Sequence, residues 1–303
     1  MYPFATLEED SPVMVLDEGM ATVLAVIGGS GFYAIPGLNN LEVLSIETPY
    51  GLPSSEVLKG QLGNTTVLFL ARHGKHHEIA PHSINYRANV CALKMAGATH
   101  LISLSAVGSM RDSVRPSDVV VVSDFIDLTR KRLSSFFDAG VVAHVAMAPP
   151  ICPDLARAVS LAATGAGARV HPQGTYVCIE GPQFSTRAES LLYRSWNVDV
   201  VGMTAMPEAK LAREAELPYS TIAFVTDYDC WNEAEAKVSV EVVLATLRQN
   251  ADLAPKIIRE LIDKIPNPEF SPAHDALKNA VITDPSHRDA ESRARLAWLL
   301  GTS

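Results

Sequence analysis

The segment VLAVIGGSG, residues 23–31, decides the fold class of this chain. Its five leading apolar residues, three of them β-branched, predict a strand that is buried on both faces. The GGSG that follows predicts a turn whose backbone N–H groups and serine hydroxyl can approach an anion closely. A turn that only reverses the chain is an equally good interpretation of this motif alone. A dinucleotide site is a weaker one, because the motif is not GxGxxG and no acidic residue closes a second strand about twenty positions later.

Similar short apolar runs recur along the chain and alternate with longer segments that have a helical pattern. This alternation is typical of an α/β domain. With residues 22–27, the predicted strands cover residues 67–71, 100–104, 119–123, 175–179, 198–202 and 220–225. The predicted helices cover residues 83–95, 153–164, 186–196, 207–216 and 238–264. Several of the strands end in loops that begin with small or charged residues, and ligands collect at such strand ends in α/β sheets.

The composition is that of a globular chain with a sizeable core. Of 303 residues, 48% are hydrophobic and 19% are charged, which excludes intrinsic disorder of the whole chain. The 25 basic and 34 acidic residues give a net charge of −9 without a basic block, which argues against nucleic acid as a partner. The four cysteines have no zinc-ligand spacing and suit reduced thiols in the cytoplasm.

The two ends of the chain differ from the middle. Residues 1–20 carry five acids and two prolines, and we interpret them as a disordered leader rather than a signal peptide. No run reaches the roughly 18 apolar residues that a membrane helix needs, so we expect a cytoplasmic protein that does not bind membranes. Residues 21–265 form the predicted catalytic domain, and the proline-rich and then charged residues 266–303 form an extension that we expect outside the core.

Several strand ends carry groups that can hold an anion. Arg72 follows one predicted strand, and the hydroxyls of Ser105 and Thr204 follow two others. Together with Ser30 they predict a phosphate site, although each hydroxyl alone could be a helix cap and Arg72 alone a surface charge. The nearby His73, His76, His77 and His82 lack a carboxylate or cysteine that would complete a metal site, so we predict no metal.

Two acidic residues follow the predicted strand at residues 220–225. If the extended conformation continues, Asp227 and Asp229 point the same way into one pocket. Two carboxylates this close raise the pKa of one of them, and a carboxyl that stays protonated near neutral pH can act as a general acid. The alternative is that one of these aspartates caps the following helix.

A third group of residues can contact a flat, partly apolar ligand. Phe184, in the turn EGPQFS, can stack on a heterocycle. Met203 lies beside Thr204 and can pack against the ligand. For both residues an ordinary place in the core is the alternative interpretation.

With these loops in order, the chain closely resembles the trimeric-type purine nucleoside phosphorylases, in particular those that cleave S-methyl-5′-thioadenosine. The resemblance covers residues 22–265 and rests on a series of long motifs in one order. These are IGGSGFY, ARHGKHHEIAPHSINYRAN, SAVGSMR, DFIDLT, IEGPQFSTRAES, VGMTAMPEAKLARE and FVTDYDCW. It implies a single α/β domain with a mixed, partly barrel-like central sheet flanked by helices.

The resemblance also assigns roles to matching residues. Those that would hold phosphate are Ser30, Arg72, His73, Ser105, the Ala106 amide and Thr204. Met203 would pack under the ribose, Phe184 and Ser185 would lie beside the base, and Asp227 and Asp229 would face the purine N7 and 6-amino group. An apolar wall for the 5′-methylthio group would come from Val240, Val243 and Leu244, and His144 would reach a neighbouring subunit's substrate.

The implied reaction is phosphate-dependent cleavage of S-methyl-5′-thioadenosine to adenine and 5-methylthioribose 1-phosphate, in purine and methionine salvage. Phosphate would be a co-substrate and no cofactor would be needed; the implied assembly is a homotrimer or a hexamer built from trimers. Asp229 argues for adenine, because a 6-oxo group would meet an unpaired acceptor at a cost of about 1–3 kcal/mol. The main alternative is a phosphorylase with broader or 6-oxopurine specificity; a hydrolytic nucleosidase would leave the anion site unexplained.

The chain departs from these relatives at a few positions. Ser30 and Ser105 stand where threonine is frequent, and Gln183 stands where arginine is frequent. Gly202 precedes Met203 where some members have asparagine, which removes one possible polar contact with the substrate. Altered affinity or a tolerance for adenosine would follow from that loss.

Overall fold

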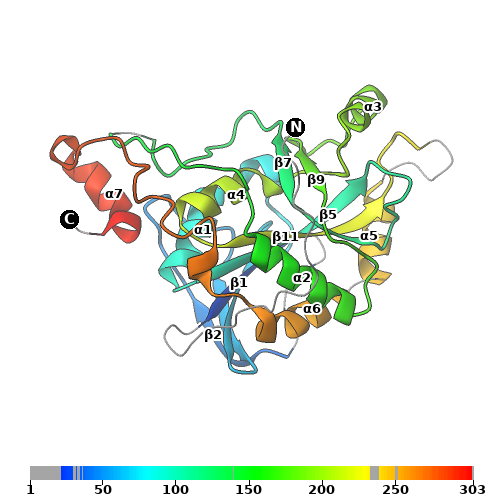
Figure 1. Cartoon of the computed structure of the whole chain (residues 1–303), viewed down its shortest axis with the longest axis horizontal. Helices are drawn as coiled ribbons and strands as arrows, with labels where there is room; N and C mark the ends of the chain where they lie inside the picture. Colours follow the sequence, from blue (N-terminus) through cyan, green and yellow to red (C-terminus); the bar gives the residue numbers. More distant parts are fainter. Residues whose placement is uncertain are drawn as a thin grey trace.

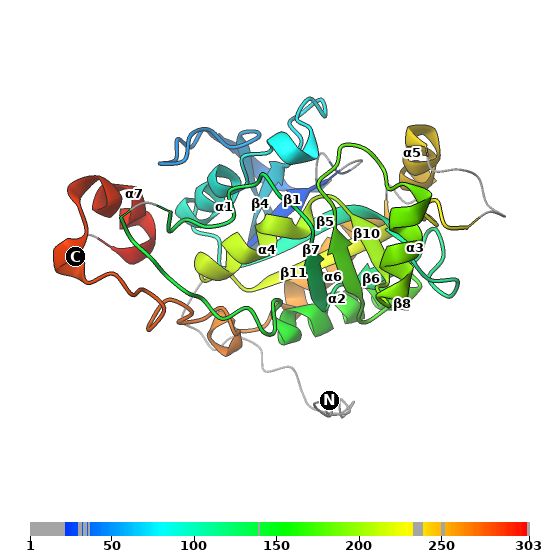
Figure 2. The same ribbon diagram turned by 90° about the horizontal axis from the view of Figure 1, so that it is seen from above.

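The computed structural model describes residues 22–29, 32, 35, 37–138, 140–232, 239–249 and 252–301. Figure 1 shows these residues as one sheet flanked by helices, and Figure 2 shows the same arrangement from above. The predicted leader at residues 1–20 lies outside the described residues.

Within the described residues, eleven strands form one mixed sheet, as predicted. The path β2-β3-β4-β1-β5-β10-β9-β7 is joined by β11, which pairs with β5 and β6, and by β8, which pairs with β6. The strands are β1 (Val23–Gly28), β2 (Asn39–Leu44), β3 (Val57–Leu62), β4 (Thr65–Ala71), β5 (His100–Ser109), β6 (Val119–Val121), β7 (Asp124–Asp127), β8 (Val170–His171), β9 (Thr175–Cys178), β10 (Val200–Gly202) and β11 (Tyr219–Asp227).

Strand β5 is the centre of this sheet. Its first half pairs in parallel with β1, its last residues pair antiparallel with β10, and β11 pairs in parallel along most of its length. β5 therefore joins two branches of the sheet, the path through β1 and β10 and the branch through β11. Residues 24–27 of β1 are fully buried, as the apolar run predicted.

The described residues form seven helices. They are α1 (Tyr86–Met95), α2 (Pro153–Gly165), α3 (Arg187–Ser195), α4 (Ala205–Glu214), α5 (Val240–Gln249), α6 (Leu253–Leu261) and α7 (Ala290–Leu300), all within the described residues. Helix α2 packs beside α6, and α1 packs beside α4 (Figures 1 and 2). Short 3-10 turns cover Pro81–Ser83, Ile262–Lys264, Pro268–Phe270 and Pro285–His287.

The structure corrects some predicted boundaries. The single helix predicted over residues 238–264 is two helices, α5 and α6. Pro255 is tolerated in the first turn of α6 but would interrupt a continuous helix, because proline has no N–H and its ring clashes with the preceding turn. The strand predicted to end at residue 104 runs on to Ser109, since β10 and β11 both pair with its second half. Sequence reasoning missed β2, β3, β7 and β8.

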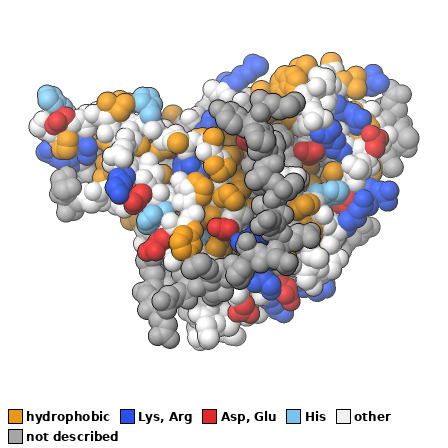
Figure 3. Space-filling view, viewed as in Figure 1, with side chains coloured by type: hydrophobic (Ala, Val, Ile, Leu, Met, Phe, Trp, Pro, Cys, Tyr) orange, Lys and Arg blue, Asp and Glu red, His pale blue; other side chains and the backbone are white. Residues whose placement is uncertain are grey.

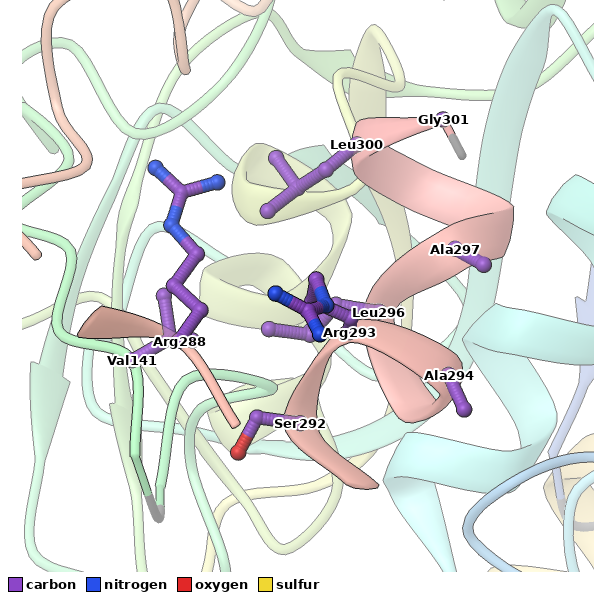
Figure 4. Close-up of a pocket in the computed structure, with 9 residues that line it drawn as sticks. All are labelled: Val141, Arg288, Ser292, Arg293, Ala294, Leu296, Ala297, Leu300 and Gly301. Carbon is purple, nitrogen blue, oxygen red and sulfur yellow. The ribbon is translucent and has the colours of Figure 1, made fainter. Parts of the chain in front are cut away.

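The C-terminal segment is more tightly attached than predicted. We expected residues 266–303 outside the core, yet Leu277, Ala280 and Leu296 are buried in the main hydrophobic cluster. Helix α7 nevertheless lies at the edge of the molecule in Figure 1. With Val141 it encloses a cavity of about 200 Å³, into which Figure 4 shows Leu300 and Leu296 projecting beside Arg288 and Arg293.

The surface carries charges of both signs (Figure 3), and the cysteines form no disulfides among the described residues. Figure 3 shows basic and acidic side chains interspersed over the described part of one face. Among the described residues, no helix has the length and apolar character needed to cross a bilayer. Cys91, Cys152, Cys178 and Cys230 are free thiols, and the first three are buried.

Candidate active site

One cavity of about 440 Å³ brings together most of the residues that the sequence singled out. It opens where β5, β10 and β11 end and where α4 and α5 begin. The predicted residues that line it are His73, Ser105, Ala106, Phe184, Ser185, Met203, Thr204, Asp227, Asp229, Val240, Val243 and Leu244. The predicted convergence of these strand ends at one place is therefore observed, while the role of each residue stays a prediction.

Three predicted residues are not in the lining of this cavity. Ser30 lies outside the described residues, next to Gly29, which does line the cavity. Arg72 is fully buried behind the cavity wall. His144 is exposed, and its backbone N–H donates to the carbonyl of Ala280 in the C-terminal segment.

Two buried hydroxyls define one part of the cavity. Ser105 and Thr204 are 2% and 7% exposed, and their side-chain oxygens lie 3.5 Å apart. Thr204 stands at the N-cap position of α4, but its side chain makes no capping bond. The capping alternative therefore does not hold for Thr204, whose hydroxyl faces Ser105. Ser105 lies inside β5 rather than at a loop start.

Arg72 is held by a buried carboxylate. Its Nε and Nη2 donate to the two oxygens of Glu208 at 2.8 and 3.0 Å, its Nη2 also donates to Ser103, and its Nη1 donates to the Leu104 carbonyl. Burial disfavours the charged guanidinium, but the charge and hydrogen bonds of Glu208 outweigh this and raise the pKa of Arg72. One Nη1 hydrogen is left, and a Cβ at Gly29 would come within 2.9 Å of Nη1. Only glycine lets this wall approach the guanidinium so closely.

His73 is held as a neutral ring. Burial lowers its pKa to about 4, and the neighbouring charge of Arg72 acts in the same direction. Its Nδ1 lies 2.8 Å from the carbonyl oxygen of Ile79, and its ring stacks on His77 with centroids 4.4 Å apart. Among the described residues, no three histidine, cysteine or acidic side chains gather closely enough to hold a metal ion.

The two aspartates reach the cavity in a different way from the predicted one. β11 ends at Asp227, and Asp229 has a positive φ of 50°, so the extended conformation does not continue. Instead the Asp229 amide donates to Asp227 Oδ1 at 2.8 Å, which closes a turn around the first carboxylate. Burial is the largest cause that raises the pKa of both carboxyls, and their mutual repulsion, which the sequence suggested, is a minor cause for Asp227.

Sequence reasoning missed Arg132, which ties the walls of the cavity together. Its side chain is 1% exposed and donates to the carbonyls of Met203, Met206 and Glu180 and to the Glu180 carboxylate. It thereby joins the segment before α4 to the loop that carries Phe184 and Ser185. The TRKR run offers three basic side chains, and no local pattern distinguishes the buried one from its neighbours.

Comparison with known proteins identifies the family. A model of the phosphorylase superfamily matches residues 23–263. An S-methyl-5′-thioadenosine phosphorylase of Geobacter sulfurreducens is 48% identical, over 93% of this chain and 99% of its own length. A crystal structure of a methylthioadenosine phosphorylase from an Antarctic soil metagenomic library has a TM-score of 0.87 and 46% identity, covering 92% of this chain and 99% of its own.

A more distant solved relative is the methylthioadenosine phosphorylase of Schistosoma mansoni in complex with adenine. It has a TM-score of 0.77 and 37% identity, over 79% of this chain and 90% of its own. These matches extend over the sheet and the segments that line the cavity. The chain belongs to the phosphorylase superfamily and, within it, to the family of the S-methyl-5′-thioadenosine phosphorylases.

Proposed function

We propose that this protein cleaves S-methyl-5′-thioadenosine with inorganic phosphate, giving adenine and 5-methylthioribose 1-phosphate. One observation supports this proposal most directly: a single cavity joins buried hydroxyls to buried carboxylates. Ser105 and Gly108 are three residues apart on β5, about 10 Å along a strand, and Asp227 is the register partner of Gly108. That separation suits a ligand that has an anion at one end and a base at the other.

Phosphate is the proposed ligand of the hydroxyl end. Ser105 and Thr204 can donate hydrogen bonds to its oxygens, and both line the cavity. Arg72 lies behind the wall as a buried ion pair with Glu208, and its Nη1 lies beside Gly29. A direct contact of Arg72 and Ser30 with phosphate stays a prediction.

Asp227 is the proposed general acid. As the bond from the base to C1′ breaks, negative charge grows on the purine and positive charge grows on the ribose. A carboxyl whose pKa is raised by burial can protonate or hydrogen-bond N7, and the phosphate anion stabilises the ribose cation. Phosphate oxygen then bonds to C1′ as adenine leaves, so the reaction takes no cofactor or metal in this proposal.

Asp229 and the apolar wall set the proposed specificity. The carboxylate of Asp229 can accept a hydrogen bond from the 6-amino group of adenine. Val240, Val243 and Leu244 line the cavity with apolar surface, which favours a methylthio group over a hydroxyl at the 5′ position.

Product analysis tests this function. The protein is mixed with methylthioadenosine, adenosine or inosine, each with and without phosphate. We expect phosphate-dependent release of adenine, fastest from methylthioadenosine. Preferential cleavage of inosine would contradict the role of Asp229, and cleavage without phosphate would identify a hydrolase.

A trimer is the proposed assembly, with His144 serving a neighbour's site. His144 is exposed and does not line the cavity of its own chain. It follows Ala143, which forms a β-bridge with Val281, and the residue after Val281, Ile282, is 65% exposed. Co-assembled His144→Ala and Asp227→Asn chains should recover activity, because mixed trimers contain complete sites. If mass measurements show that mixed trimers have formed and activity is still not recovered, the sites are not shared between subunits.

A cytoplasmic location stays a prediction from the composition.

A further inference from the structure

Tyr176 lies outside the cavity and contacts Ser105 and Thr204 at the hydroxyl end. We call this part of the cavity the phosphate end, because we propose that phosphate binds there. Tyr176 lies on β9, its side chain is fully buried, and it is not part of the cavity lining. Its hydroxyl oxygen lies 3.2 Å from Ser105 Oγ and 3.4 Å from the backbone nitrogen of Thr204. One phenol therefore contacts two cavity residues that come from separate parts of the chain.

The chemistry of these groups fixes the direction of one hydrogen bond and favours one direction for the other. The Thr204 N–H can only donate, so the phenol oxygen accepts from it. Burial raises the pKa of Tyr176 to about 12, so the phenol keeps its single hydrogen at neutral pH, and Ser105 Oγ is the acceptor within reach. The hydrogens of the Ser105 and Thr204 hydroxyls are then left for the contact between these two groups and for a ligand in the cavity. An anion needs such donors, because its unprotonated oxygens only accept.

Gly202 makes room for this phenol. Gly202 pairs with Cys178 in the register of β10 and β9. A Cβ at Gly202 would lie 2.0 Å from the Tyr176 hydroxyl oxygen and 2.5 Å from the ring carbon that bears it. Any side chain at position 202 would therefore displace the ring from Ser105 and Thr204.

We propose that Tyr176, admitted by Gly202, is a positioning residue that orients Ser105 and Thr204 as hydrogen-bond donors to phosphate. This inference rests on the proposed function, because it needs an anion at that end of the cavity. The inference also explains why this chain has glycine at position 202, where some relatives have asparagine. The ring of Tyr176 occupies the space that a side chain at position 202 would fill.

The test compares Tyr176→Phe with Tyr50→Phe. Tyr50 is a matched control, because its hydroxyl donates to the Phe136 carbonyl at 3.4 Å and its side chain is outside the cavity lining. In Tyr176→Phe the KM for phosphate should rise about tenfold, the size expected for a lost hydrogen bond at an anion site, while the KM for the nucleoside changes less than about twofold. Tyr50→Phe should leave both KM values unchanged. The increase in Tm that phosphate gives the wild type should shrink only in Tyr176→Phe.

A second variant tests the same contact from the other side. Gly202→Ala should displace the ring and raise the KM for phosphate at least as much as Tyr176→Phe does. An unchanged KM for phosphate in either variant would overturn the inference. An equal rise of both KM values with a lowered Tm would also overturn it, because that pattern indicates a merely structural role. If the wild type needs no phosphate, the proposed function itself is wrong, which the wild-type assay shows independently of any variant.

Discussion

The two ends of the cavity are built differently. At the phosphate end, Ser105, Thr204 and His73 are almost fully buried on or beside strands and are backed by the Arg72–Glu208 pair. At the other end, Phe184 is 43% exposed and Val240 is 58% exposed. The side chains of the phosphate end are held in place within one chain before a ligand binds. Donors that are fixed in this way can stabilise the charge of a transition state without first having to move. The other end offers apolar surface that one chain leaves open, consistent with the neighbouring subunit that we propose.

The largest effect should come from Asp227, a buried carboxylate that lines the cavity. Asp227→Asn removes the proposed acid but keeps the size of the side chain. We expect kcat to fall about 10²- to 10⁴-fold with little change in the KM for phosphate. Steady-state kinetics check this, with Asp124→Asn on the exposed start of β7 as control. A variant that keeps more than a tenth of the wild-type kcat would exclude Asp227 as the acid.

Breaking the pair behind the phosphate end should cost stability. Glu208→Gln leaves the fully buried Arg72 without its charge partner, and we expect the free energy of unfolding to fall by about 3–5 kcal/mol. Chemical denaturation measures this loss. Glu42→Gln breaks the exposed pair with Lys59 and should change little. If both substitutions lowered the free energy of unfolding equally, the buried pair would contribute no more to stability than an exposed one, which would contradict this prediction.

Acid should destabilise the fold through two buried histidines, His73 beside the cavity and His100 at the start of β5. His73 and His100 have pKa values lowered by burial to about 4 from 6.5, so the unfolded chain binds more protons below pH 6.5. Their contribution to stability is present above pH 6.5 and is lost as the pH falls toward 4, about 2–3 kcal/mol between pH 7 and pH 5.5 for the pair.

Asp227 and Asp229 act in the opposite direction, because their raised pKa values favour the protonated fold. The histidine contribution is therefore measured by a variant: denaturation at pH 7 and pH 5.5 should show that His100→Asn loses less stability between the two pH values than the wild type, by about half of the histidine contribution. A pH dependence that this variant leaves unchanged would contradict the role of burial.

The smallest effect belongs to the open end. Val240→Ser should lower the preference for methylthioadenosine over adenosine by about two- to tenfold, less than a fully buried contact would give. The ratio of kcat/KM values measures it. Val43→Ser on β2 has a similar exposure of 55% and should leave the ratio unchanged. An unaltered preference in Val240→Ser would remove this residue from the 5′ subsite.

How far the sequence could predict this site depended on whether a residue's partner was local. Ser105, Thr204 and Asp227 were found because each lies at or near the end of an apolar run. The buried ion pair of Arg72 could not be predicted, because Glu208 stands 136 positions away and no local pattern connects the two residues. Tyr176 and Arg132 were missed for the same reason: each acts through contacts that exist only after the sheet has closed. Asp229 was placed in the cavity correctly but by a wrong argument, because a left-handed turn replaces the extended chain.

The hydrogen bond between His73 and Ile79 has a consequence for the choice of anion at the phosphate site that we propose. A carbonyl only accepts, so the neutral ring carries its hydrogen on Nδ1 and its Nε2 presents a lone pair. Hydrogen phosphate can donate its own O–H to that lone pair. Sulfate has the same shape but no proton at neutral pH, so it meets two acceptors facing each other. Sulfate should therefore compete poorly with phosphate despite their matching size and charge.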